Sequence, residues 1–340
     1  MPNTLTHYLC GLEAIKGLEN EKCRKLILKH QNVFNLGTQG PDILFYHELW
    51  PWTSRTVSPN IGQTMHTAKV NEVFKGFINY IIKQSDYIKE ILTVYFMGFL
   101  CHNCMDSIGH PYVFYWSGFK PASEKNENLY HYYHRRFETN IDVLLCKIFL
   151  NKKVHELHHE KQLEISPIEQ NIISDMYKSV VKSVYRVELQ KKKIIKAIKD
   201  MLLVEKLVKD PYGIKRCLIG TIDRLIFGFP LYSSIIFPSE INDGLDYLNL
   251  KNREWCMPYD NTIKSSQSFP ELFKEAYERT QRFCDVLYSS VFFNNSSITY
   301  ALKLFGNNSY TSGKDCDKET EFTYSDNIFE KKAAVPNKTI

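Results

Sequence analysis

Apolar residues recur at helical spacing along most of the chain. In residues 4–19 they stand at positions 5, 9, 12, 15 and 18, and residues 66–84 repeat the pattern. Spacings of three and four place such side chains on one face of a helix, where they can pack against a core. The sequence therefore predicts an all-α fold, with helices over 4–19, 66–84, 86–106, 129–150, 168–209, 214–227 and 270–303.

The third of these helices contains an expected end signal. Gly109 and Pro111 flank His110, and a glycine followed by a proline commonly ends a helix. We therefore predict that the helix ends near residues 109–111 and that His110 lies just past it.

The distribution of histidine divides the chain. All eleven histidines lie within the first 159 of the 340 residues. A chain of this length is expected to form about two domains. We predict a site-bearing region over residues 1–160, a helical C-terminal region of unknown role over 161–310, and a polar, poorly ordered tail over 311–340.

Charge, cysteines and apolar runs limit the class of protein. Lys and Arg number 43 against 38 Asp and Glu, a net charge of +5, which fits an anionic substrate but is no signature of nucleic-acid binding. Nine cysteines without a regular framework favour reduced thiols. The N-terminus lacks a secretory pattern, and the apolar runs at 91–101 and 224–238 fall short of the roughly 20 uninterrupted residues that cross a bilayer. We expect a cytoplasmic protein with no transmembrane segment.

Two segments repeat acidic and histidine side chains every four residues. The first contains His102, Asp106 and His110, and the second contains His134, Glu138 and, one turn further, Asp142. Residues four apart share one face of a helix, so two facing helices would bring six nitrogen and oxygen donors to one pocket. Imidazole and carboxylate are ligands that zinc prefers. One such pair usually reflects a helix-stabilising contact, whereas two pairs in the histidine-containing region favour a metal site.

The order of these residues resembles a known family. His7, "QGPDILFYH" with Asp42, His66, "HNCMDSIGH" and "HRRFE" are together similar to the zinc-dependent phospholipase C family and its relatives, the single-strand-specific zinc nucleases, over about residues 1–160. The resemblance implies an all-α fold and a cluster of zinc ions. It implies one zinc on Asp42, His66, His102 and Asp106, a second on His110, His134 and Glu138, and a third shared by Asp106 and His7.

The number of zinc ions depends on the N-terminus. Exported members of the family complete the third site with the amino group of a processed N-terminal tryptophan, whereas this chain begins Met1-Pro2-Asn3. The resemblance therefore implies two or three Zn²⁺ per chain. The step of four residues from Asp106 to His110 is also shorter than in the best-known phospholipases, which implies a tighter connection between the zinc positions.

The resemblance also implies a chemistry. Zinc ions in such a cage lower the pKa of a bound water toward about 7 and neutralise charge on phosphoryl oxygens. We expect hydrolysis of a phosphate ester, with a phospholipid-like substrate and Asp42 as both ligand and catalytic base. Peripheral membrane contact fits this expectation, and Lys191, Lys192 and Lys193 could meet anionic headgroups, although such a run is usually a solvated helix face.

Two alternatives remain open. One is a nuclease on the same metal cage, which should carry a basic stripe with exposed stacking aromatics that a net charge of +5 does not indicate. The other is a non-catalytic, zinc-stabilised interaction protein, in which the metal would be fully coordinated with no open position.

Overall fold

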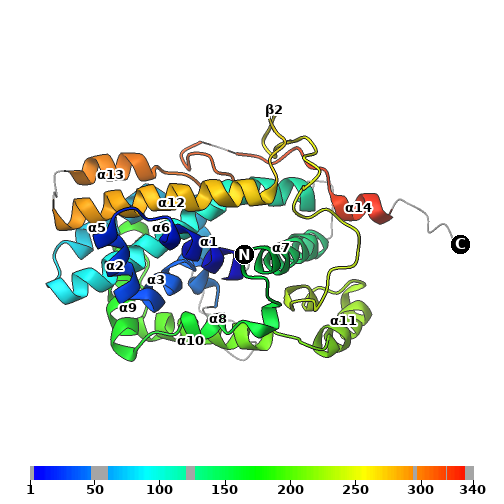
Figure 1. The fold of residues 1–340 in the computed structure, drawn as a ribbon, viewed down its shortest axis with the longest axis horizontal. Helices are drawn as coiled ribbons and strands as arrows, with labels where there is room; N and C mark the ends of the chain where they lie inside the picture. The colour runs from blue at the N-terminus through cyan, green and yellow to red at the C-terminus, as the bar shows by residue number, and fades with distance from the viewer. Residues whose placement is uncertain (1–3, 47–59, 120–126, 294–296, 319, 334–340) are drawn as a thin grey trace, which may run out of the picture.

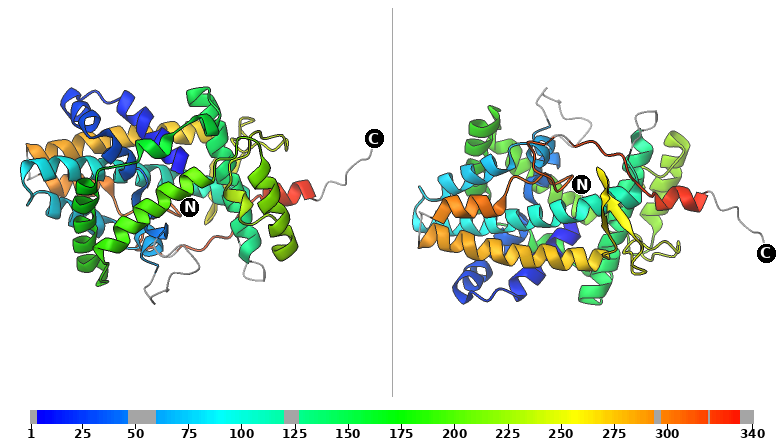
Figure 2. Two further views of the ribbon diagram at one scale, coloured as in Figure 1. Left: turned by 90° about the horizontal axis from the view of Figure 1, so that it is seen from below. Right: turned by 90° about the horizontal axis from the view of Figure 1, so that it is seen from above.

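The computed structural model describes residues 4–46, 60–119, 127–293, 297–318 and 320–333. Helices form nearly all of the regular structure, so the predicted all-α fold is confirmed (Figures 1 and 2). The only strands of these residues are β1 (Trp255–Met257) and β2 (Asp260–Ser265), an antiparallel pair in which Trp255 lies opposite Ser265.

Each predicted periodic segment contains helix, with several interruptions. In chain order the α-helices are α1 (Thr4–Lys16), α2 (Glu21–Lys29), α3 (Gln31–Gly37), α4 (Ile61–Thr67), α5 (Val70–Ile81), α6 (Asp86–Ser117), α7 (Glu127–Leu150), α8 (His159–Gln162), α9 (Pro167–Tyr185), α10 (Lys191–Leu207), α11 (Ile214–Phe227), α12 (Phe269–Phe292), α13 (Ile298–Phe305) and α14 (Ile328–Ala333). Of these, helices α2, α3, α8 and α14 were not predicted. Three 3₁₀ turns, η1 (Gly40–Tyr46), η2 (Val154–Glu156) and η3 (Ser233–Ile235), connect them. The predicted helix over 168–209 is two helices because Arg186 adopts a left-handed conformation, with φ of 59°, and ends α9.

The predicted end of the third helix was wrong. Helix α6 continues through His110 and Pro111 and ends at Gly118, whose φ of 77° and hydrogen bond to the Phe114 carbonyl, 3.0 Å, form the cap. Proline lacks the N–H that would bond to the carbonyl of Ser107, so it usually breaks a helix. Gly313 packs against that carbonyl, since a Cβ there would lie 2.4 Å from the Ser107 oxygen. Tertiary packing therefore holds His110 inside the helix.

Helix α6 runs through the centre of the molecule. Helices α3 and α12 make its most extensive contacts, and α1 and α7 also pack against it. The approach of α3 depends on two glycines, because a Cβ on Gly98 would lie 2.2 Å from the Phe34 carbonyl oxygen and a Cβ on Gly37 would lie 2.3 Å from that of Tyr95. This close contact brings the start of η1 beside the middle of α6.

The core does not separate the two predicted regions. Two clusters of buried apolar side chains each contain residues from both sides of residue 160, such as Phe99 with Phe283 and Tyr112 with Phe269. The described part of the predicted tail also packs on the protein. The Asp326 N–H donates to the Tyr115 carbonyl, 2.8 Å, and Phe329 is buried. Residues 334–340 of that tail lie outside the described residues.

Among the described residues, α6 alone is long and apolar enough to cross a membrane. In its most apolar 18-residue window, however, 94% of the residues are buried inside the protein. This burial is typical of the core helix of a folded domain.

Candidate metal centre

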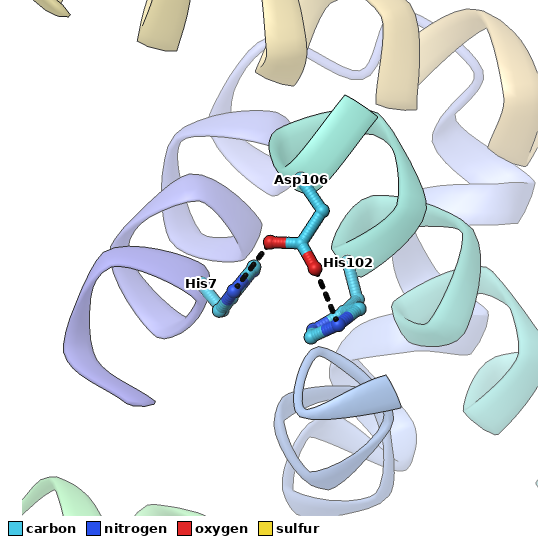
Figure 3. A group of neighbouring side chains, drawn as sticks. All are labelled: His7, His102 and Asp106. Carbon is cyan, nitrogen blue, oxygen red and sulfur yellow. Dashed lines mark ion pairs between the residues drawn. The ribbon is translucent and has the colours of Figure 1, made fainter. Parts of the chain in front are cut away.

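Three groups of donor atoms come together where α1, η1, α4, α6 and α7 meet. In the first, His7 on α1 and His102 on α6 approach Asp106 from either side (Figure 3). The His7 Nε2 lies 3.1 Å from one carboxylate oxygen of Asp106, and the His102 Nε2 lies 3.1 Å from the other. The two imidazole rings stack with their centroids 4.1 Å apart. One carboxylate therefore bridges two histidines inside the fold.

The second group shares His102 with the first. It contains Asp42 on η1 and His66 on α4. The His66 Nε2 lies 2.9 Å from the Asp42 Oδ1 and 3.9 Å from an oxygen of Asp106, while the His102 Nε2 lies 4.0 Å from the same Asp42 oxygen. All of these side chains are buried. The two groups thus form a continuous cluster.

The third group lies one helical turn along α6. His110 faces His134 and Glu138 on α7, with His134 Nε2 2.8 Å and His110 Nε2 3.4 Å from the Glu138 Oε1. The His110 ring also stands 3.7 Å, through Nδ1, from an oxygen of Asp106. The ligand atoms of each group lie within 4.8 Å of one another. All eight residues that the family resemblance assigned to zinc therefore occupy three adjoining groups.

Three of the histidines are oriented by backbone carbonyls. The Nδ1 of His102 donates to Thr38, 3.0 Å, that of His66 donates to Gly62, 2.7 Å, and that of His110 donates to Tyr310, 2.6 Å. A hydrogen bond from Nδ1 fixes the ring and leaves the Nε2 lone pair free to bind a cation, an arrangement typical of histidine ligands to metals.

A comparison with known protein families agrees with this geometry. The family model described as zinc dependent phospholipase C matches residues 6–193, more than half of the 340-residue chain and all eight of these positions. The chain belongs to the zinc-dependent phospholipase C family. No curated protein and no solved structure matches the chain.

Unpaired buried atoms show that the residues of this zinc-dependent phospholipase C family member fit a metal ion. Among the described residues, the buried atoms of this cluster that make no hydrogen bond of acceptable geometry include five that face one another, namely His7 Nε2, Asp42 Oδ1, His66 Nε2, His102 Nε2 and Asp106 Oδ2. A buried polar atom without a partner costs free energy, and an unpaired carboxylate costs more. Cations among these five atoms would satisfy them together. Zinc, with its preference for imidazole and carboxylate, fits this donor set.

The ionisable groups of the cluster shift one another's pKa values. Although burial opposes it, His110 and His102 hold the pKa of Asp106 well below its usual range, and His102 and His66 lower the pKa of Asp42. Asp106 and Glu138 overcome the effect of burial and raise the pKa of His110 to about 9. Burial, with the neighbouring His102, lowers the pKa of His7. Both aspartates are therefore ionised at neutral pH and ready to bind a cation.

Gly40 is needed beside the cluster. Its φ is 51°, and a Cβ at this position would lie 2.5 Å from the His102 ring. The Gly40 carbonyl also accepts a hydrogen bond from the Tyr177 hydroxyl, 3.0 Å. The glycine of "QGPD" therefore permits both the turn that presents Asp42 and the close approach of His102.

Tyr310 also contributes to the site, although no motif in the sequence indicates it. Its carbonyl orients His110, its N–H donates to the His66 carbonyl at 2.9 Å, and its ring lies 5.0 Å from that of His66 and 5.6 Å from that of His102. Backbone groups from the C-terminal segment thus complete a site whose donor side chains are all N-terminal. Because any residue provides a carbonyl, the sequence carries no signal for this role.

One expected donor lies elsewhere. Asp142 is not part of the three groups found among the described residues. It accepts hydrogen bonds from the N–H of Thr6, 2.9 Å, and from the Thr6 hydroxyl. The N–H groups at the start of a helix lack partners within that helix, so this buried carboxyl caps α1 instead of joining the cluster. It thereby positions the helix that carries His7.

Two cavities of the described residues bear on the position of the site. A small one of about 20 Å³, enough for roughly one water, is lined by Asp106, His110 and Glu138 among others. A larger one of about 560 Å³ lies between the end of α7 and residues 237–242 and contains none of the eight donor residues. The smaller cavity therefore adjoins the donor groups, whereas the larger one does not.

Proposed function

We propose that this protein hydrolyses a phosphate ester bond of a phospholipid-like substrate, as a zinc-dependent phosphodiesterase. Membership of the zinc-dependent phospholipase C family supports a zinc-dependent hydrolase. The observation that carries the proposal is the set of histidines whose Nδ1 atoms bond to backbone carbonyls while their Nε2 atoms face buried carboxylates. Histidine rings held in this orientation are characteristic of metal ligands, and a purely structural core does not require it.

The three groups indicate which residues would hold zinc. We assign Asp42, His66, His102 and Asp106 to one ion, His110, His134 and Glu138 to a second, and Asp106 with His7 to a third position. Zinc bound there supplies an acidified water and positive charge for the phosphoryl oxygens. The chain supplies the burial that excludes bulk water around these groups.

Asp42 is our candidate for the catalytic base. Its carboxylate is buried at the start of η1, and its Oδ1 lies 2.9 Å from the His66 Nε2. Because His102 and His66 lower its pKa against the effect of burial, the group is ionised at neutral pH. An ionised carboxylate in this place can accept a hydrogen bond from an attacking water, orient it and receive its proton.

The cellular setting is part of the proposal. All nine cysteines are free thiols. Free thiols on this scale support a reducing compartment, and we propose the cytoplasm.

The proposal is tested by metal content and substrate choice together. After dialysis against metal-free buffer, inductively coupled plasma mass spectrometry should find two or three zinc ions per chain. The zinc-loaded protein should then hydrolyse a chromogenic phosphocholine ester and a phospholipid. Degradation of single-stranded DNA without ester turnover would instead identify a nuclease. Tightly bound zinc without any turnover would identify the non-catalytic alternative.

Two variants sharpen the assay. Asp42→Asn should reduce turnover by at least about a hundredfold, the range for removing a general base, while the protein stays folded. His30→Gln is the matched control, because His30 contacts Glu90, 3.4 Å away, and no member of the three groups. It should keep both the zinc and the turnover of the wild type. Full activity of Asp42→Asn would remove Asp42 from the catalytic role.

A further inference from the structure

Helix α11 presents apolar side chains on the outside of the molecule. It lies at the edge of the fold beyond α7 (Figure 1). Leu225 is 83% exposed, Ile226 66% and Leu218 62%. The full set of exposed large apolar residues on this helix is Ile214, Leu218, Ile219, Ile222, Leu225 and Ile226, and we call it the α11 face. Exposed apolar patches of this kind usually mark an interaction site.

Polar contacts hold the helix with this face outward. Its buried residues are Gly220 and Asp223. The Asp223 carboxylate accepts a hydrogen bond from the Ser233 N–H, 2.7 Å, and Arg216 donates to the carbonyl of Ile236. A Cβ on Gly220 would lie 3.1 Å from the Ser233 hydroxyl oxygen. The usual orientation of an amphipathic helix is thus reversed, with the polar side inward, and this reversal is fixed by specific bonds.

The charges around the α11 face are basic. Between residues 211 and 232 the exposed charged side chains are Lys215 and Arg224, and the one carboxylate in this range, Asp223, is buried. Neighbouring α10 adds Lys206 beside exposed Leu207, whose carbonyl accepts a hydrogen bond from Lys215 at 3.2 Å. Tyr212 and Tyr232 stand exposed at either end of α11. Apolar residues with basic and tyrosine neighbours match the interface of an anionic bilayer.

These observations favour a membrane over a second copy of the chain. A symmetric dimer through this face would bring the Lys215 and Arg224 side chains of the two copies close together, and like charges oppose association. A bilayer with anionic lipids instead attracts both. The 14 residues of α11 extend only about 21 Å, too short to span a bilayer but suited to lie in its surface.

The chain that follows α11 contacts the helix that carries the third donor group. The Phe229 ring lies 5.6 Å from that of Tyr132 on α7, and the Thr139 hydroxyl donates to the Ser234 carbonyl, 2.9 Å. His134 and Glu138 belong to the same helix. A surface bound through α11 therefore lies on the side of the molecule that includes α7.

We propose that the α11 face docks this protein onto an anionic phospholipid membrane. The proposal rests on the proposed function in one respect, since it names the membrane as the place where the lipid substrate is met. This surface differs from the one that the lysine run 191–193 indicated. That run lies at the start of α10, and its first residue, Lys191, is paired with Asp175 at 2.6 Å. The docking surface is apolar with a basic border.

The test measures binding of the full-length, zinc-loaded protein to large unilamellar vesicles by co-sedimentation. Vesicles of phosphatidylcholine with phosphatidylserine should bind the wild type more strongly than phosphatidylcholine alone. The triple variant Leu218→Gln, Ile222→Gln and Leu225→Gln removes apolar area but keeps good helix formers. Its partition coefficient should fall by roughly tenfold or more.

A second triple variant serves as the matched control. Leu28→Gln, Ile168→Gln and Tyr300→Gln change three residues that are similarly exposed but lie on α2, α9 and α13. These changes should leave vesicle binding unaltered. Equal loss of binding in both triple variants, or no loss in the α11 variant, would overturn the proposal. So would a wild-type dimer that ignores vesicles and becomes monomeric in the α11 variant, because the face would then join two copies.

Turnover of a soluble chromogenic ester separates this proposal from the catalytic one. The α11 variant should retain wild-type turnover of the soluble ester and lose hydrolysis of vesicle lipid, which supports docking and also shows that the variant is folded. If the wild type binds anionic vesicles through α11 yet hydrolyses no ester with zinc bound, docking is supported and the catalytic proposal fails. If the soluble ester is hydrolysed and α11 does not affect vesicle binding, the docking proposal fails alone.

Discussion

Helices α6 and α11 are both rich in apolar residues, but the fold uses them in opposite ways. Helix α6 is buried along its most apolar stretch, and its polar side chains His102, Asp106 and His110 are buried with it. Helix α11 buries Gly220 and Asp223 and leaves its leucines and isoleucines outside. Composition alone does not distinguish the two. A buried polar group and an exposed apolar face are the informative exceptions, and each marks a site.

The two exceptions differ in what offsets their cost. Burying a carboxylate is tolerated where hydrogen bonds or opposite charges surround it, as the histidines surround Asp106. The α11 face has no such compensation within the described residues. A metal ion inside the protein would offset the cost of burying Asp106. Only a surface outside the protein could offset the cost of exposing the α11 face.

The largest expected effect comes from Asp106. Asp106→Asn keeps the volume of the side chain but removes the charge that meets His7, His102 and His110. We expect loss of at least one zinc and a fall in kcat/KM of about a thousandfold, the scale seen when a preorganised electrostatic contact is removed. Mass spectrometry of the metal content and turnover of the soluble ester measure both effects.

Asp142→Asn is the matched control for this variant. Asp142 is equally buried, but its partner is Thr6. Burial raises the pKa of Asp142 well above its usual range, so a neutral amide in its place changes little of the charge. Zinc content should stay at the wild-type level. If Asp142→Asn loses as much zinc as Asp106→Asn, then removing any buried carboxyl near α1 lowers zinc binding, and the assignment of Asp106 as a zinc ligand is contradicted.

The four-residue spacing of the donor residues is the part of this site that the sequence could predict. His102, Asp106 and His110, like His134 and Glu138, stand four residues apart, so their common face follows from the helix itself. The carbonyls of Thr38, Gly62 and Tyr310 that orient the rings leave no trace in the side-chain pattern, because every residue has one. Their contribution depends on tertiary structure alone.

The same limit applies to the helices. Pro111 signals an end of α6 that packing against Gly313 overrides. The periodicity of residues 214–227 correctly predicts α11, yet it does not say which side faces inward. That direction is set by Asp223 and Ser233, a pair ten residues apart whose contact requires the chain to turn back after α11 ends at Gly228. Periodicity therefore predicts where helices form, while single tertiary hydrogen bonds determine which side of a helix faces the protein.

A pair of leucines tests the contrast between the helices directly. Leu100 on α6 is fully buried, and Leu225 on α11 is 83% exposed. Leu100→Ala should lower the free energy of unfolding by about 2–5 kcal/mol, the cost of a core cavity. Leu225→Ala should change it by no more than about 0.5 kcal/mol. Urea denaturation at a fixed zinc concentration measures both, because bound metal itself stabilises the folded state. A large loss in Leu225→Ala would mean that the α11 face is covered within the protein.

Two glycines give the smallest and most selective comparison. Gly40, beside His102 of α6, and Gly213, which precedes α11, both have positive φ, 51° and 71°. A Cβ on Gly213 has no atom within 4 Å, so Gly213→Ala should cost only the left-handed conformation, about 1–2 kcal/mol.

Gly40→Ala carries the same conformational cost and also displaces the His102 ring, because its Cβ would lie 2.5 Å away. We expect about 1–2 kcal/mol of further destabilisation, as for overpacking, together with reduced zinc content. The metal measurement separates the two causes, since backbone strain alone would leave zinc binding as it is in Gly213→Ala. Equal zinc content in both variants would show that the position of His102 does not depend on the space left by Gly40.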